Sequence, residues 1–261
     1  MKALATKVKF IANLFGINLR ILFQQLTGLP KEYLRYRLFL RLRNPNDNWP
    51  IDFSYPICFD RRESAGTAQG QYFLQDIHVA RKVFQNNPQR HIDVGSRIDG
   101  FVAHVASFRE IEVLDIRNLK SHVKEIKFTQ ANLFEAPQHL LACADSVSCL
   151  HALEHFGLGR YGDPLDPTGH IKGLESLRRL LKPGGILYLS VPFGRRKIEF
   201  NAHRIFDTEK IKKLLDSKFT NEEITLFDDS IGRINIESYE ELTKLEGKVS
   251  SACVCLVLRL I

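Results

Sequence analysis

The chain has 261 residues, which suits one large domain or one domain with an appendage. Its 44% hydrophobic and 26% charged residues are ordinary for a soluble globular protein. Five cysteines without CxxC spacing argue against a disulfide framework and favour reduced thiols in a cytoplasmic protein. Cys253 and Cys255 lie two apart in an apolar run, so we expect them in the core rather than on a metal.

The net charge of +7 is concentrated at the N-terminus. Residues 1–43 hold nine basic residues and one acidic residue, whereas the rest of the chain holds 28 basic and 29 acidic residues. A nearly neutral body argues against nucleic acid as its partner. The basic arm, residues 1–43, instead raises an anionic membrane surface as a peripheral partner.

An amphipathic helix is expected within the arm, from Phe10 to Leu29. Arg20 at mid-length disfavours a transmembrane span, and no small-residue cleavage site follows to indicate a signal peptide. Two interpretations stay open: the helix packs on the domain or in a dimer, or it lies in the membrane interface. A polar stripe supports either interpretation: Lys9, Asn13, Gly16, Arg20, Gln24 and Thr27.

The next segment, residues 44–66, is rich in proline and asparagine and is expected to be a linker. Residues 67–261 then form the main domain, which begins with a helix over 69–86. Strands and helices alternate after it, which predicts an α/β fold with a parallel sheet covered on both faces. The expected strands are 91–95, 112–117, 127–132, 146–153 and 185–192, and the expected helices are 101–108, 137–143, 170–181 and 207–217.

Two further apolar runs, 222–228 and 250–261, end the chain without a helix behind them. The last run therefore suits an antiparallel strand inserted into the sheet. In open α/β sheets, ligands bind at the carboxyl ends of the parallel strands. The loops that follow those strands are where functional side chains are expected.

Two segments carry a family resemblance. Asp145-Ser-Val-Ser-Cys-Leu-His-Ala-Leu-Glu-His155 and Leu181-Lys-Pro-Gly-Gly-Ile-Leu-Tyr-Leu-Ser-Val-Pro192 together resemble the class I S-adenosylmethionine-dependent methyltransferases. The resemblance implies a Rossmann-like, seven-stranded sheet with an antiparallel last strand, and S-adenosylmethionine as the cofactor. The stretch 150–170, with Asp93–Phe101 and Ser190–Gly194, also resembles a family catalogued as a domain of unknown function, with nematode and bacterial members.

The segment Asp93-Val-Gly-Ser-Arg97 stands where the first strand meets a helix. Asp93 and Gly95 match the methyltransferase glycine motif, and Ser96 lies in the same turn. Arg97 and Asp99 occupy the positions of the next two glycines. Three interpretations of Arg97 stay open: it blocks the cofactor, it binds the methionine carboxylate, or it belongs to a solvated turn.

Four more positions complete the expected cofactor site. Asp115 ends the second strand, where a carboxylate can accept both ribose hydroxyls. Ile116 is compatible with adenine packing, and the resemblance places Asn132 near the adenine amino group. His151 begins the loop that, by the resemblance, borders the methyl group.

The expected catalytic residues lie in and around the loop 156–170. His155 is the leading candidate for the base that deprotonates an acceptor hydroxyl, helped by Glu154, Asp163 or His170. The alternative is that these histidines only hold the loop by hydrogen bonds. His151-Ala-Leu-Glu-His155 also matches a zinc-protease pattern, but that pattern needs a helix and here follows a strand, so no metal is expected.

The sequence therefore predicts a methyltransferase that acts on an unknown acceptor, for which a sugar hydroxyl of a membrane-linked glycan is the working hypothesis. A cationic cluster after the fifth strand, Arg195 to Lys197 with His203 and Arg204, suits a phosphate or carboxylate of the acceptor. Two alternatives stay open: a non-catalytic protein that binds a nucleotide-like ligand or a partner, and a nicotinamide-dependent oxidoreductase. The sequence does not specify the oligomeric state.

Overall fold

The computed structural model describes residues 15–44, 46, 48–58, 63–215, 217–249 and 251–261. The chain divides into two compact units, 1–67 and 68–261. Each unit is described by itself.

The first unit contains one long helix, α2 (Leu19–Leu42), and none of its residues is buried. The side-chain oxygen of Asn18 accepts hydrogen bonds from the backbone N–H groups of Arg20 and Ile21, which fixes the helix start. Residues 15–18 are not helical, so the predicted helix over 10–29 is not continuous, and α2 extends beyond Leu29 through Pro30. Residues 10–14 lie outside the described residues.

Neither α2 nor any other helix in the described part of the chain is long and apolar enough to cross a membrane.

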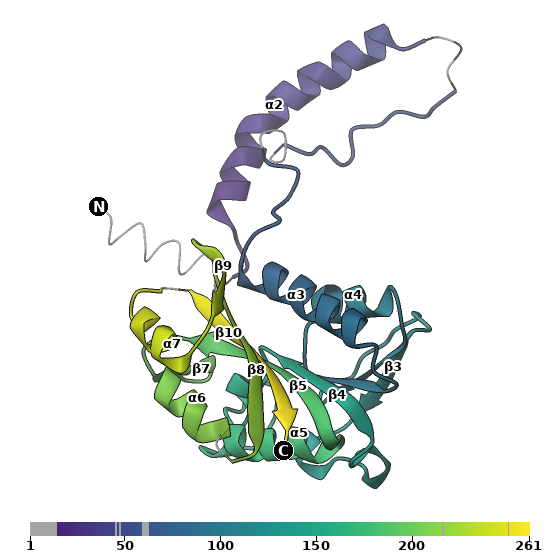
Figure 1. Ribbon diagram of the computed structural model, residues 1–261. Coiled ribbons are helices and arrows are strands. Elements are labelled where there is room, and N and C mark those ends of the chain that lie inside the picture. The colour runs from purple at the N-terminus through teal and green to yellow at the C-terminus, as the bar shows by residue number, and fades with distance from the viewer. Residues whose placement is uncertain (1–14, 45, 47, 59–62, 216, 250) are drawn as a thin grey trace. The chain divides into compact units, whose positions relative to one another are not determined.

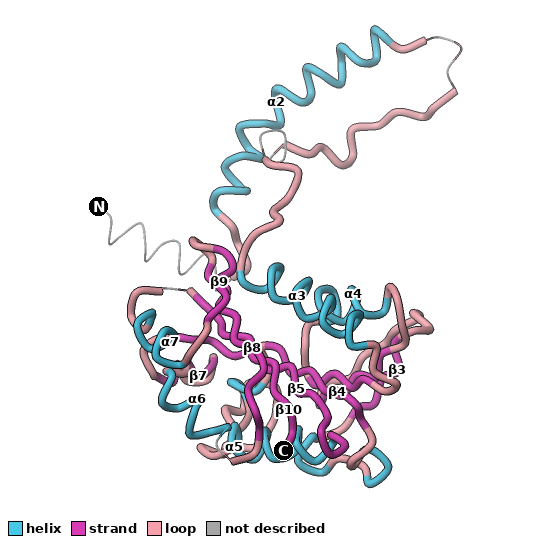
Figure 2. The backbone as a smooth tube through the Cα atoms, viewed as in Figure 1, coloured by secondary structure: helices cyan, strands magenta, loops and turns pink. Residues whose placement is uncertain are grey.

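The second unit is built on one sheet of eight strands in the order β3-β2-β1-β4-β5-β10-β8-β9 (Figures 1 and 2). Strands β1 to β5 pair in parallel, whereas β10 pairs antiparallel with β5 and β8. The predicted antiparallel insertion of the last strand is confirmed. One strand, β9, extends the predicted seven-stranded sheet. The bounds are β1 (His91–Val94), β2 (Ile111–Asp115), β3 (Ile126–Gln130), β4 (Ala144–Leu150), β5 (Leu181–Phe193), β8 (Phe219–Asp228), β9 (Gly232–Ile236) and β10 (Ala252–Leu260).

Helices cover both faces of this sheet (Figure 1). On one face lie α3 (Gln71–Asn86) and α4 (Ala103–Ala106), and on the other lie α5 (Gly169–Leu180) and α6 (Thr208–Leu215). The helix predicted over 137–143 is only a 3-10 turn, Gln138–Leu140. The sequence did not indicate α7 (Tyr239–Leu245) or the short hairpin of β6 (Lys197–Glu199) and β7 (His203–Ile205).

Two hydrophobic cores separate the layers, because alternate residues of a strand point to opposite faces. In β10, Val254 and Leu256 pack with α5 and α6, whereas Cys253 and Cys255 pack with α3 and α4. Both cysteines are free and buried, as expected of core thiols. In β1 the same alternation turns Asp93 toward the α3 side, into the interior.

Candidate functional site

The turn after β1 is closely packed against the loop after β4. Gly95 has φ +71°, a conformation that favours glycine. A Cβ atom there would lie 3.0 Å from the Cβ atom of Ala152. The glycine therefore lets two adjacent strand ends approach each other.

The buried side chain of Asp93 links these two strand ends. Its carboxylate accepts hydrogen bonds from the Ser96 hydroxyl (2.6 Å) and the Ser148 hydroxyl (2.5 Å), and the Ser96 oxygen accepts one from the Leu150 N–H (3.1 Å). Asp93 is fully buried and lines neither of the cavities described below. It positions the turn, while Gly95 and the backbone of Ser96 reach the cavity.

Burial raises the pKa of Asp93 from its ordinary 3.8 to about 6. The folded state thus binds this proton more tightly than the unfolded chain, so the stabilisation is complete below about pH 4 and is lost as the pH rises through about 6. We expect Asp93→Asn to remove a pH dependence of at most about 3 kcal/mol from the free energy of unfolding. Urea unfolding of both proteins between pH 4 and 7 measures it, and parallel pH profiles would contradict the burial of the charge.

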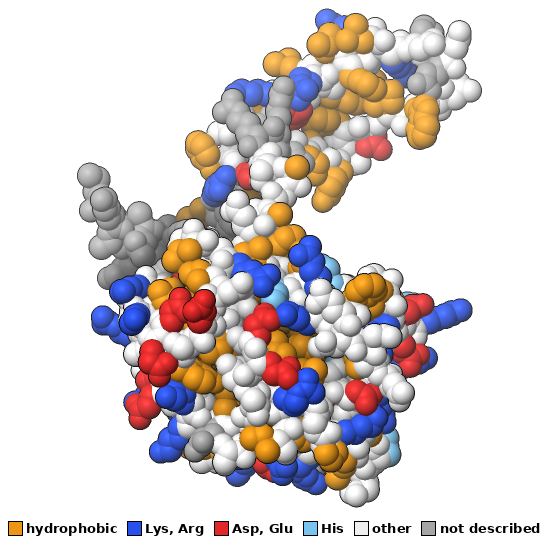
Figure 3. Space-filling model, in the orientation of Figure 1, with side chains coloured by type: hydrophobic (Ala, Val, Ile, Leu, Met, Phe, Trp, Pro, Cys, Tyr) orange, Lys and Arg blue, Asp and Glu red, His pale blue; other side chains and the backbone are white. Residues whose placement is uncertain are grey.

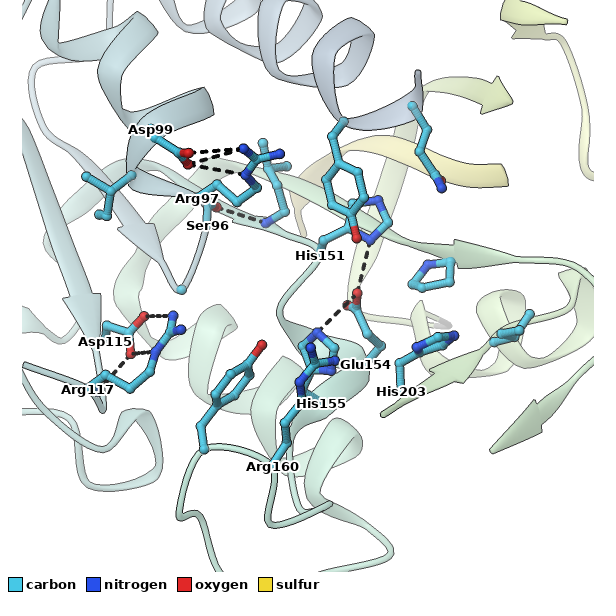
Figure 4. A pocket seen from close by; sticks show the side chains of 18 of the residues that line it. Ser96, Arg97, Asp99, Asp115, Arg117, His151, Glu154, His155, Arg160 and His203 are labelled. Carbon is cyan, nitrogen blue, oxygen red and sulfur yellow. Dashed lines mark hydrogen bonds and ion pairs between the residues drawn. The ribbon is translucent and has the colours of Figure 1, made fainter. Parts of the chain in front are cut away.

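Arg97 lines the larger cavity from its rim, where it pairs with Asp99 (Figure 4). The Arg97 Nη2 and Asp99 Oδ2 atoms lie 3.2 Å apart, and both side chains are largely exposed. Gly100 stands one position later than the motif requires because it serves packing: a Cβ atom there would overlap the carboxylate of Asp76 on α3. The degenerate glycine pattern is therefore accommodated without closing the cavity.

Two adjoining cavities lie where the parallel strands end, of about 760 Å³ and about 80 Å³. The smaller cavity is mainly apolar and includes Ile116 and Asn132, whose side-chain oxygen accepts a hydrogen bond from the Phe134 N–H. The larger includes Ser96, Arg97 and Glu154. Four predicted residues line both cavities: Gly95, Asp115, His151 and His155.

Asp115 stands at the junction of the two cavities, and its side chain is 13% exposed. Arg117 donates to its two oxygens from Nε (2.9 Å) and Nη2 (2.6 Å), as Figure 4 shows. The guanidinium carbon of Arg117 also lies 4.4 Å from the ring centre of Tyr161. The ribose-binding carboxylate predicted here is thus already paired, so a ribose would have to replace part of that pair.

Glu154 lies between two histidines beside the larger cavity (Figure 4). Its Oε1 atom lies 3.0 Å from His151 Nδ1 and 3.7 Å from His155 Nε2, and its side chain is 1% exposed. His155 donates from Nδ1 to the Ala202 carbonyl (2.6 Å). Burial is the largest cause that lowers the pKa of His155.

Asp163 fixes the backbone of the loop 156–170 by hydrogen bonds. Its carboxylate accepts from the N–H groups of Gly157 (2.7 Å) and Tyr161 (3.3 Å). It reaches only the edge of the smaller cavity. Asp163 therefore stabilises the loop conformation in which Arg160 and Tyr161 line the larger cavity.

His170, the other predicted base, is not brought to the site. It begins α5, lines neither cavity, and packs edge-on against Phe206 with ring centres 6.0 Å apart. Burial, followed by the charge of Arg204, lowers its pKa to about 4. Arg204, expected to meet the acceptor, is itself buried and donates to the carbonyl of Phe156 (2.6 Å), so it holds the loop instead.

Sequence reasoning missed Tyr72, at the start of α3. Its ring packs on His151 with centres 4.3 Å apart and lines the larger cavity. A tyrosine in the first turn of an amphipathic helix carries no motif, so no sequence signal singled it out.

The strand order and the antiparallel insertion of β10 define the fold of the class I S-adenosylmethionine-dependent methyltransferases. The profile of the family described as "Caenorhabditis protein of unknown function, DUF268" matches residues 100–261. The chain belongs to this family, which confirms the predicted resemblance. No curated protein matches the sequence significantly.

Two crystal structures illustrate the likeness in fold. The 1,6-didemethyltoxoflavin-N1-methyltransferase of Burkholderia thailandensis, with bound 1,6-didemethyltoxoflavin and S-adenosylhomocysteine, is 15% identical with a TM-score of 0.51, over 71% of this chain and 78% of that one. The [4+2]-cyclase SpnF is also 15% identical with a TM-score of 0.51, over 75% of this chain and 85% of that one. Identities this low establish the fold alone.

Proposed function

We propose that the protein transfers a methyl group from S-adenosylmethionine to an oxygen acceptor, at the larger cavity. The observation that carries this proposal is the convergence of Gly95, Asp115, Asn132 and Glu154 on two adjoining cavities at the carboxyl edge of a methyltransferase sheet. Four strand ends contribute these residues, and none of them is adjacent in sequence.

The residues fit the parts of the cofactor. The apolar smaller cavity suits an adenine beside Ile116 and Asn132, and Asp115 at the junction suits the ribose hydroxyls. Gly95 leaves backbone space for the methionine portion, and Arg97 at the rim offers a cation for its carboxylate. The bound cofactor would supply a methyl group already activated on sulfur. The protein would then align the acceptor and exclude water.

The acceptor end of the larger cavity is lined by polar and aromatic side chains, which suits a hydroxylated molecule such as a sugar. Tyr72 and Tyr161 offer aromatic faces, and Arg160 and His203 offer hydrogen-bond donors. A glycan hydroxyl therefore stays the proposed acceptor.

A non-catalytic ligand-binding role is the second candidate, and the Asp115–Arg117 pair is the observation that favours it. Cofactor carrying a labelled methyl group separates the two roles. Incubated with the protein and a cellular glycan fraction, it should label the glycans and yield S-adenosylhomocysteine. Saturating, tight cofactor binding with the label fully recovered on the cofactor, across all cell fractions, would favour the non-catalytic role.

We also propose that residues 1–43 contact an anionic membrane surface. Along α2, apolar side chains such as Leu22, Phe23 and Leu34 are exposed, and basic side chains stand among them (Figure 3). Each basic residue near an anionic surface contributes about 1 kcal/mol. Replacing Arg35, Arg37 and Arg41 together by Gln should therefore weaken vesicle binding about 100-fold.

Flotation with vesicles that contain or lack anionic lipid measures this contact. The parent should float only with anionic vesicles, and a chain lacking residues 1–43 should not float. Equal, negligible flotation of both proteins would leave the arm with a packing role.

A further inference from the structure

His151 and Glu154 form a buried pair, in which the Glu154 carboxylate orients the imidazole ring of His151. His151 Nδ1 lies 3.0 Å from Glu154 Oε1, and the two side chains are 5% and 1% exposed. Because a carboxylate oxygen only accepts, Nδ1 carries the proton and the lone pair of the ring falls on Nε2. The carboxylate thus fixes the tautomer in which Nε2 can accept a proton.

The free ends of this pair have no protein partner. His151 Nε2 and Glu154 Oε2 are both buried, and neither has a hydrogen-bond partner among the residues that the structure describes. Buried polar atoms in proteins are nearly always paired. His151 lines both cavities, so a molecule bound there is the natural source of the missing partner.

The backbone at His151 adopts a left-handed conformation. Its φ of +53° is uncommon for a residue other than glycine, and such conformations cluster at active sites. The residue follows directly on β4, and Tyr72 packs against its ring. The ring is therefore held between a helix and a strand end, at the point where the two cavities meet.

We propose that His151, held by Glu154, is the general base of the methyl transfer, and that the acceptor group is a hydroxyl. This inference rests on the proposed function. As the acceptor oxygen forms its bond to the methyl carbon, the carbon–sulfur bond breaks and its electron pair stays on sulfur. The hydroxyl proton passes to His151 Nε2, directly or through one water, and Glu154 stabilises the imidazolium.

We assign His155 a positioning role, because its Nε2 atom faces the Glu154 carboxylate, whereas the Nε2 atom of His151 has no partner among the described residues. The Nδ1 atom of His155 donates to the Ala202 carbonyl, and its Nε2 lies 3.7 Å from the carboxylate that already holds His151. His170, which is also buried but lines neither cavity, serves as the matched control.

Nitrogen-15 NMR of the full chain with labelled histidine tests the tautomer without any acceptor. We expect His151 to carry its proton on Nδ1, and Glu154→Gln to weaken that preference. A proton on Nε2 in the parent would overturn the proposal, whether or not methyl transfer is observed. The signal is assigned by its absence in His151→Asn.

The variants are compared in two measurements. Labelled S-adenosylmethionine with the glycan fraction gives the transfer rate, and calorimetry with S-adenosylhomocysteine gives the cofactor affinity. His151→Asn should lower the transfer rate about 100-fold or more and leave cofactor affinity within about threefold, whereas His170→Asn should keep most of the rate. A retained rate, or an equal loss of cofactor affinity, in His151→Asn would overturn the base assignment. Failure of the parent itself to bind S-adenosylhomocysteine would instead reject the proposed function.

Discussion

Asp115→Ala should weaken the binding of S-adenosylhomocysteine about 100-fold. The variant loses two charge-assisted hydrogen bonds to the ribose, each worth about 1.5–3 kcal/mol. In the parent, a ribose that displaces Arg117 from Asp115 breaks an ion pair. This cost offsets only part of the binding free energy of the two hydrogen bonds, because Arg117 is half exposed and such pairs contribute at most about 1 kcal/mol. Titration calorimetry measures the change.

Asp99→Ala is the control for this experiment. Asp99 also carries a carboxylate beside the larger cavity and pairs with an arginine, but its side chain is 80% exposed. Its removal should leave the affinity within about twofold. If Asp115→Ala binds the cofactor as tightly as the parent, the ribose is held elsewhere.

Gly157→Ala should destabilise the second unit by about 3 kcal/mol or more, and Gly162→Ala by only about 1–2 kcal/mol. Both glycines have positive φ, +77° and +85°, so an L-residue is strained at either position. A Cβ atom at Gly157 would also overlap the carbonyl oxygen of Asp166, whereas Gly162 has open space around it. The overlap forces a backbone shift that costs about 1–3 kcal/mol more.

Urea unfolding of the two variants separates strain from overlap, because the strain is common to both. The same pair of variants examines the loop as part of the site. Gly157→Ala should also weaken cofactor binding, since the Gly157 N–H donates to Asp163 in the loop that carries Tyr161. Equal stabilities for the two variants would show that the loop yields easily. The glycines would then supply conformational freedom to the loop.

The sheet could be predicted from the sequence because most of its strands are short apolar runs that are bounded by loop-forming residues. The position of Cys253 and Cys255 on one face of the last strand follows from alternation. The extra strand β9 was missed although Gly232–Ile236 alternates polar and apolar residues, because an alternation over five residues is too short to stand out. The start of the arm helix at Leu19 could not be predicted because it depends on a single cap, Asn18, inside a continuous amphipathic pattern.

The positions of the site were predictable where a residue ends a strand, and not where it depends on a loop. Asp115, Ile116 and Asn132 line cavities because strand ends meet at one edge of a parallel sheet. The roles of His151, His155 and His170 depend instead on which neighbour each ring nitrogen meets. That arrangement is set by Tyr72, Ala202 and Phe206, which are distant in sequence.

Side-by-side titration of the parent with S-adenosylhomocysteine and with NAD tests the central claim most directly. Both ligands offer an adenine and a ribose to Asp115, but only the first offers a homocysteine portion, the counterpart of the cofactor's methionine, to the turn at Gly95. We predict one site for S-adenosylhomocysteine per chain, with a micromolar dissociation constant, which corresponds to a binding free energy of about −8 kcal/mol. We predict no measurable binding of NAD. Tighter binding of NAD, or binding of neither ligand, would contradict the assignment of these cavities to S-adenosylmethionine.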